Sequence, residues 1–109
     1  MTEKTTNLAH LNDQLRRTGL GGKVLITSGV QSLSHTMQAR LLQAIASFDD
    51  FTEANDPHSE HDFGAVDFEG AKYFWKIDYY DQSYEAGSPD PLDAEVTRRV
   101  MTVMRADEY

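Results

Sequence analysis

Imidazole and carboxylate groups are concentrated in one short stretch of the chain. Residues 56–62 read DPHSEHD, and five of these side chains are ionisable: Asp56, His58, Glu60, His61 and Asp62. Groups of this kind can together bind a divalent metal, and a bound metal can activate water for hydrolysis. The stretch therefore predicts a candidate polar site, in which the metal ligands would be His58, Glu60, His61 and Asp62.

Two further acids, Asp78 and Asp81, flank a pair of tyrosines later in the chain. If Asp78 lies near Glu60 or His61, two carboxylates and an imidazole would converge as an acid–base or metal-binding set. We therefore include Asp78 and Asp81 in the candidate site. The alternation of a surface strand explains Asp78 equally well.

The spacing of these residues matches no strong catalytic or metal motif. The HExxH pattern is absent, and the acids of residues 49–60 lack the alternation and central glycine of a calcium loop. The stretch also fits a structural role, in which Asp56 caps a turn, Pro57 fixes the bend and His61 is a hydrogen-bonded structural histidine. No cofactor is predicted, and a divalent metal stays open as an alternative.

Charge is distributed unevenly along the 109 residues, whose formal net charge is -8. Residues 49–95 contain fourteen acidic residues and two lysines, whereas residues 1–48 contain five basic and two acidic residues. An acidic field repels phosphate backbones, so direct nucleic-acid binding through this segment is not expected. The expected partner is a basic protein surface.

The composition favours one small folded domain spanning residues 1–109, with residues 1–6 as a flexible N-terminus. Cysteine is absent, which excludes disulfides, cysteine zinc sites and thiol nucleophiles. No signal peptide or membrane-spanning run is visible, so we expect a cytoplasmic protein that is not bound to membranes. Aromatic residues such as Phe51 and Tyr84 would offer a surface for self-association, which leaves a homo-oligomer open.

The hydrophobic pattern predicts an α+β domain with the element order α-β-α-β-β-β. Helices are expected over residues 7–18 and 34–47, and a short buried strand, central in the sheet, over residues 23–27. Residues 28–34 read as a polar turn. Period-two alternation around Gly70 predicts an antiparallel hairpin whose Trp75 face is the core face.

The last segment, residues 96–105, is ambiguous between strand and helix. Its valines fall at helical spacing after good helix-starting residues, but its β-branched residues and its alternation favour a strand. If residues 96–105 form a strand, the sheet is antiparallel with about four strands, and the two helices lie on one of its faces.

Several sequence motifs of this chain resemble those of a small bacterial family of unknown function. They are NDP at residues 55–57, EHDFG at 60–64, FWKIDYYD at 74–81, SPDP at 88–91 and RVMTVM at 99–104. That family occurs on alphaproteobacterial chromosomes, plasmids and phage-like elements. The resemblance implies a free-standing bacterial domain and carries no reaction, ligand or catalytic residue.

Two functions from different classes follow from these observations. The first is a non-enzymatic interaction protein whose acidic middle segment binds a basic protein surface; a nucleic-acid-mimicking antagonist from a mobile element is a special case. The alternative is a metal-dependent hydrolase, such as a nuclease, that uses the loop of residues 56–62. Whether the protein is an enzyme is left open, with the interaction protein favoured.

Overall fold

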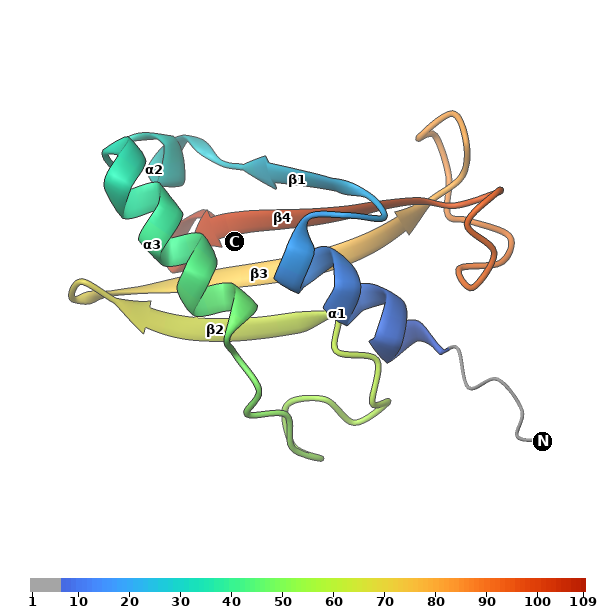
Figure 1. Cartoon of the computed structure of the whole chain (residues 1–109), viewed down its shortest axis with the longest axis horizontal. Coiled ribbons are helices and arrows are strands. Elements are labelled where there is room, and N and C mark those ends of the chain that lie inside the picture. The colour runs from blue at the N-terminus through green and yellow to red at the C-terminus, as the bar shows by residue number, and fades with distance from the viewer. Residues whose placement is uncertain (1–6) are drawn as a thin grey trace.

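A computed structural model describes residues 7–109 of the chain. The helices and strands follow in the order α1 (Leu8–Thr18), β1 (Lys23–Ile26), α2 (Ser28–Gln31), α3 (His35–Ala46), β2 (Phe63–Phe68), β3 (Ala71–Tyr80) and β4 (Arg98–Arg105), and a 3-10 turn, η1 (Ala106–Glu108), ends the series (Figure 1). This is the predicted α+β order, with α2 and η1 added as short helical turns. The predicted single domain is compatible with this architecture, whereas the prediction for residues 1–6 lies outside the described residues.

Both long helices begin at a capping side chain. The Asn7 side chain accepts a hydrogen bond from the backbone amide of His10, and Gly19 ends α1 in the left-handed conformation with a φ of 78°. Ser34 caps α3 in the same way as Asn7 caps α1, by accepting from the amide of Met37. The predicted helices over residues 7–18 and 34–47 are therefore confirmed. Residues 28–34, expected as a turn, contain the single helical turn α2.

The sheet is mixed, so the prediction of a purely antiparallel sheet is wrong. The strand order is β1-β4-β3-β2, in which β1 pairs with β4 in parallel and the other pairs are antiparallel. The β2–β3 hairpin turns at Gly70, and β4 returns beside β3. β4 therefore lies between β1 and β3, and it runs in the same direction as β1.

The prediction that the first strand is buried and central is also wrong. β1 lies at the edge of the sheet, and Val24 and Leu25 are 36% and 51% exposed. The central position belongs to β4, the segment that the sequence left ambiguous. β4 has apolar side chains on both faces, and Val100 and Met101 are both buried, which is what a central strand requires.

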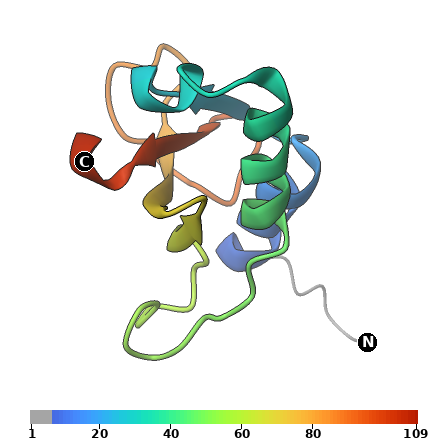
Figure 2. The same ribbon diagram turned by 90° about the vertical axis from the view of Figure 1, so that its left-hand side faces the viewer.

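The core lies between the helices and the Trp75 face of the sheet, as predicted. Figure 2 shows α1 and α3 on one side of the sheet and the C-terminal end on the other. The buried cluster comprises Leu15, Val30, Leu41, Ile45, Tyr73, Trp75, Ile77, Met101 and Val103. Gly64 is paired with Trp75 across the hairpin, and a Cβ at Gly64 would lie 2.6 Å from the indole ring. The absence of a side chain there makes room for Trp75.

Candidate functional site

The loop between α3 and β2 brings two predicted site residues, Glu60 and His61, into contact with α1, and a third, Asp56, into contact with His61. In both ribbon views this loop projects from the body of the domain before it returns to the start of β2 (Figure 1, Figure 2). A network of side chains fastens the returning part to α1 and β3. We call this network the polar cluster, and its members are Asn12, Asp13, Arg16, Asp56, Glu60, His61 and Tyr79.

Arg16 lies at the base of the polar cluster and is 4% exposed. Its Nη1 donates to the backbone carbonyls of Ile45, Ala46 and Phe48 at 2.8, 3.1 and 2.8 Å. Carbonyls at the C-terminal end of a helix lack partners within the helix, so Arg16 acts as a cap for α3. Its Nη2 donates to Oδ1 of Asp13 at 2.9 Å, which balances the buried charge.

Aromatic rings enclose the same guanidinium. The Cζ of Arg16 lies 5.1 Å from the ring centroid of Trp75 and 5.4 Å from that of Phe51. A cation over an aromatic face is attracted by the ring quadrupole, and more strongly where water is excluded. Arg16 therefore connects the hydrophobic core to the polar cluster.

His61 is held between two carboxylates. Its Nδ1 lies 3.0 and 3.1 Å from the two carboxylate oxygens of Asp13, and its Nε2 lies 3.6 Å from Oδ2 of Asp56. The imidazole also stacks on Phe51, with ring centroids 3.8 Å apart and an angle of 4° between the planes. The backbone of His61 has a φ of 55°, an uncommon conformation for a residue other than glycine. These contacts stabilise that conformation.

Asp56 organises the backbone of the loop. Its Oδ1 accepts from the amides of Glu60 and His61 at 3.0 and 3.3 Å, and the residue is 8% exposed. This geometry is the turn-capping arrangement that the sequence offered as a structural role. Asp13, the other carboxylate at His61, is partly buried, which opposes its ionisation, but hydrogen bonds from Arg16 and His61 outweigh burial and lower its pKa.

The upper part of the polar cluster joins α1, the loop and β3. Asn12 Nδ2 donates to the Glu60 carbonyl at 2.9 Å and to Tyr79 Oη at 2.8 Å, and that hydroxyl donates to Glu60 Oε1 at 3.3 Å. Burial and the neighbouring carboxylates of Asp62 and Glu60 raise the pKa of Tyr79 to about 12. Burial, together with the charge of Glu60, also raises the pKa of Asp62. Tyr79 therefore remains a neutral hydrogen-bonding group at physiological pH.

The remaining candidate residues are not drawn into the polar cluster. His58 is exposed, and Asp78 forms an ion pair with Lys76 at 3.1 Å on the sheet. Asp81 accepts from the amides of Ser83 and Glu85 and so caps its own turn. Across residues 7–109, no group of three or more histidine, aspartate or glutamate side chains is placed to hold a metal ion.

The sequence-based hypothesis missed the partners of His61 and Glu60. Asn12 and Asp13 come from α1, 48 residues before Glu60 and His61, and Tyr79 comes from β3. One signal was present in the sequence. Asn12 and Arg16 stand four residues apart beside Leu8 and Leu15, so they share the buried side of a helix, where polar residues need partners.

A shallow pocket opens beside the polar cluster. It has a volume of about 320 Å³, and Phe51, Glu53, Asp56 and His61 are among its lining residues. Two carboxylates and the edge of an aromatic stack suit a cationic group rather than an anion. With 26% of its side chain exposed, His61 can be reached from this pocket.

Comparison with known proteins places the chain in a family. No curated protein and no solved structure matches it. The matching family model covers residues 26–108, which includes the loop, the hairpin and β4, whereas Asn12, Asp13 and Arg16 precede the matched range. The chain therefore belongs to the family described as "Protein of unknown function (DUF3768)".

Proposed function

We propose that this domain is a non-enzymatic protein-interaction module whose acidic middle segment, residues 49–95, binds a basic surface of a partner protein. The observation that carries the proposal is the surplus of unpaired acid. Among the described residues, Asp56, Asp67 and Asp78 are the members of the fourteen acids in this segment that form ion pairs. Both lysines of the segment are already used in those pairs.

The acidic loop is held in a defined shape before any partner arrives. The polar cluster fastens its end, and its middle is closed by hydrogen bonds between Thr52 and Asn55 and from Asn55 Nδ2 to the Asp50 carbonyl at 2.9 Å. Asp49, Asp50 and Glu53 are exposed on this frame. A loop that is already ordered loses less conformational entropy on binding, which favours affinity.

The pocket beside His61 supports the chemistry of the expected partner. Glu53 and Asp56 line it together with Phe51 and His61, whose rings stack on each other. A lysine or arginine side chain entering this pocket would gain both charge pairing and aromatic contact. A basic partner surface would thus have one anchoring side chain, surrounded by longer-range attraction from the exposed acids.

A nucleic-acid-mimicking antagonist is the narrower form of this proposal. An enzyme that binds nucleic acid presents a basic groove, and a surface rich in unpaired carboxylates has the charge to compete for it. The alternative function, a metal-dependent hydrolase, gains no comparable support. Of its candidate residues, Asp78 is paired with Lys76 and His58 is exposed, and no group of three or more metal-binding side chains is placed together within residues 7–109.

The proposal is tested by capture from host lysate with matched neutral variants. Tagged wild-type protein is compared with two variants. D49N/D50N/E53Q neutralises three acids in the loop between α3 and β2. D90N/D93N/E95Q makes the same charge change in the loop between β3 and β4 and serves as the control. We expect a partner that dissociates as salt rises, because exposed charges are screened over about 8 Å at physiological ionic strength. D49N/D50N/E53Q should no longer capture that partner, whereas D90N/D93N/E95Q should capture more of it.

Two results would count against the proposal. Binding that is insensitive to salt, or retained by both neutral variants, would show that the acids do not form the interface. For the narrower form, the captured enzyme is mixed with a DNA duplex that it binds. Displacement of the duplex by this protein supports mimicry, and a ternary complex refutes it.

A further inference from the structure

The outer edge of β1 is an unpaired sheet edge. The amide of Thr27 donates to the Val103 carbonyl of β4 at 3.1 Å. Since alternate residues of a strand direct their backbone groups to opposite sides, Val24 and Ile26 face away from β4. Gln31 Nε2 donates to the Ile26 carbonyl at 2.9 Å. Within the described residues, both backbone groups of Val24 and the amide of Ile26 are left for an incoming strand.

Apolar side chains are exposed along the same edge. Leu20, Val24 and Leu25 are 63%, 36% and 51% exposed, and they are three of the six large hydrophobic residues that the described part of the chain exposes. They fall within six consecutive positions, whereas the other three are scattered over residues 84–109. An exposed apolar edge strand attracts other strands, so proteins usually protect such edges.

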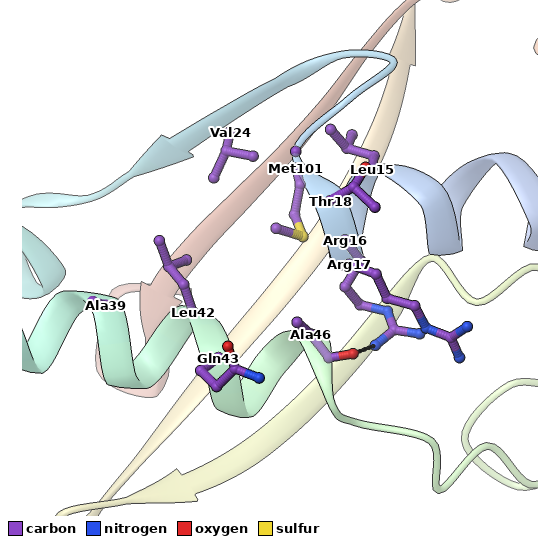
Figure 3. Close-up of a pocket in the computed structure, with 11 residues that line it drawn as sticks. Leu15, Arg16, Arg17, Thr18, Val24, Ala39, Leu42, Gln43, Ala46 and Met101 are labelled. Carbon is purple, nitrogen blue, oxygen red and sulfur yellow. Dashed lines mark hydrogen bonds between the residues drawn. The ribbon is translucent and has the colours of Figure 1, made fainter.

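A groove adjoins this edge on the helical face of the sheet. It has a volume of about 370 Å³ and lies between α1, α3 and β1. Figure 3 shows Val24 of β1 and Leu42 of α3 on its two sides, with Met101 of β4 between them and Leu15 of α1 farther along. A strand added to β1 would direct alternate side chains toward this face. The groove is therefore positioned to receive them.

The charge of this region is opposite to that of the acidic segment. Arg16 and Arg17 line the groove, and no acidic residue does. Within residues 7–48 the single acid is Asp13, whose carboxylate accepts from Arg16. Lys23 adds a further positive charge at the start of β1, with its Nζ 4.4 Å from the Tyr84 ring centroid. Two copies of this edge would repel each other, so the charge favours an acidic occupant.

We propose that the outer edge of β1 binds an extended acidic segment of a partner protein. The segment pairs with the free backbone groups of Val24 and Ile26 and extends the sheet by one strand. One of its apolar side chains occupies the groove beside Val24 and Leu42. Its carboxylates, at the alternate positions, lie on the other face of the sheet, the face of Lys23, and the exposed charge of Arg17 adds attraction over a longer range. This surface does not include Asp49, Asp50 or Glu53, the acids that the test of the function proposed above neutralises, so either proposal can fail without the other.

The test uses two capped seven-residue peptides of alternating sequence, one with valine and leucine between glutamates and one with the same apolar residues between lysines. Each is titrated into the isotope-labelled full chain and followed by amide chemical shifts. We expect the glutamate peptide to shift amides of residues 20–27 and of the groove lining. It should bind at least about tenfold more tightly than the lysine peptide, because the basic residues beside β1 attract glutamates and repel lysines.

Three variants assign the binding to this edge. Val24→Pro removes an outward amide at an edge position that tolerates proline, and should weaken binding by about fivefold. Arg17→Glu, on the exposed side of α1, should weaken binding of the glutamate peptide by about two- to fivefold and strengthen binding of the lysine peptide. Lys72→Glu, with the same charge change on the distant hairpin, should leave both affinities nearly unchanged. If Val24→Pro does not fold, the Arg17 and Lys72 variants decide.

Three outcomes would overturn the proposal. The first is equal binding of the two peptides or no binding of either. The second is a set of shifts confined to residues 49–62 or 81–97. The third is sedimentation of the wild-type chain as a dimer that Arg17→Glu strengthens, because this would assign the edge to a second copy.

Discussion

Replacing Arg16 tests whether one buried cation connects the helices to the acidic loop. In Arg16→Met the side chain keeps a similar length and apolar stem, but it loses the donors to the carbonyls of Ile45, Ala46 and Phe48 and to Asp13. The carbonyls of Ala46 and Phe48 would then lose their side-chain donor, and Asp13 would lose its main counter-charge in a partly buried position.

The expected cost is large relative to the stability of such a domain. Breaking a buried charge pair by removal of one partner costs about 3–5 kcal/mol. Domains of this size have a free energy of unfolding of about 5–15 kcal/mol. We therefore expect Arg16→Met to lower the free energy of unfolding by about 3–5 kcal/mol. Arg16→Lys should be intermediate, because an ammonium cannot reproduce the planar fork of the guanidinium.

Urea unfolding measures this cost directly. Trp75 is the single tryptophan of the chain and lies beside the guanidinium, so its fluorescence reports on the same region, and far-ultraviolet circular dichroism gives an independent signal. Arg17→Met is the matched control, because Arg17 is the exposed neighbour and its loss should change stability by less than about 0.5 kcal/mol. A cost below about 1 kcal/mol for Arg16→Met, with native-like spectra, would refute the role assigned to Arg16.

Three further predictions follow from other contacts. Gly64→Ala should destabilise the domain by about 1–3 kcal/mol in the same urea assay, because the new Cβ would lie 2.6 Å from the Trp75 ring; a neutral effect would show that the hairpin can shift. The pKa of Tyr79 rises from 10.0 to about 12 on folding, so the native state retains a proton that the unfolded chain loses, and this contribution to stability is present below pH 10 and lost as pH rises toward 12. Tyr79→Phe should therefore flatten the decline of stability in this range, and an unchanged slope would contradict the assignment. Asp13→Asn should speed hydrogen exchange of the Glu60 and His61 amides while leaving exchange in β3 unchanged, since Asp13 holds the loop through His61; equal protection in both proteins would show that Asp56 alone orders the loop.

The sequence predicted the elements better than their arrangement. Local signals such as the helical spacing of apolar residues and the alternation around Gly70 depend on near neighbours, and they give the correct helices and hairpin. The position of β1 depends on which segment pairs with it. A short apolar run looks the same whether it is central or at an edge. β4 takes the central position instead. It is buried on both faces, which its own ambiguous pattern did not reveal.

The candidate site was predicted in part for the same reason. The density of ionisable groups drew attention to a loop in which the structure brings Asp56, Glu60 and His61 together. Their partners on α1 are distant in the sequence, and nothing in the loop itself specifies them. The polar residue Asn12 and the cation Arg16 lie beside leucines on one helix, which indicates that α1 packs against a polar element but does not identify the element. The structure supplies that pairing.

The central place of β4 has a consequence for how the chain folds during synthesis. β4 is the last strand to be made, yet it lies between β1 and β3 and joins them. Until residues 98–105 have left the ribosome, β1 has no neighbour in the sheet and the β2–β3 hairpin has a free inner edge. A nascent or truncated chain would therefore expose aggregation-prone edges, and the domain would close late, around its final strand.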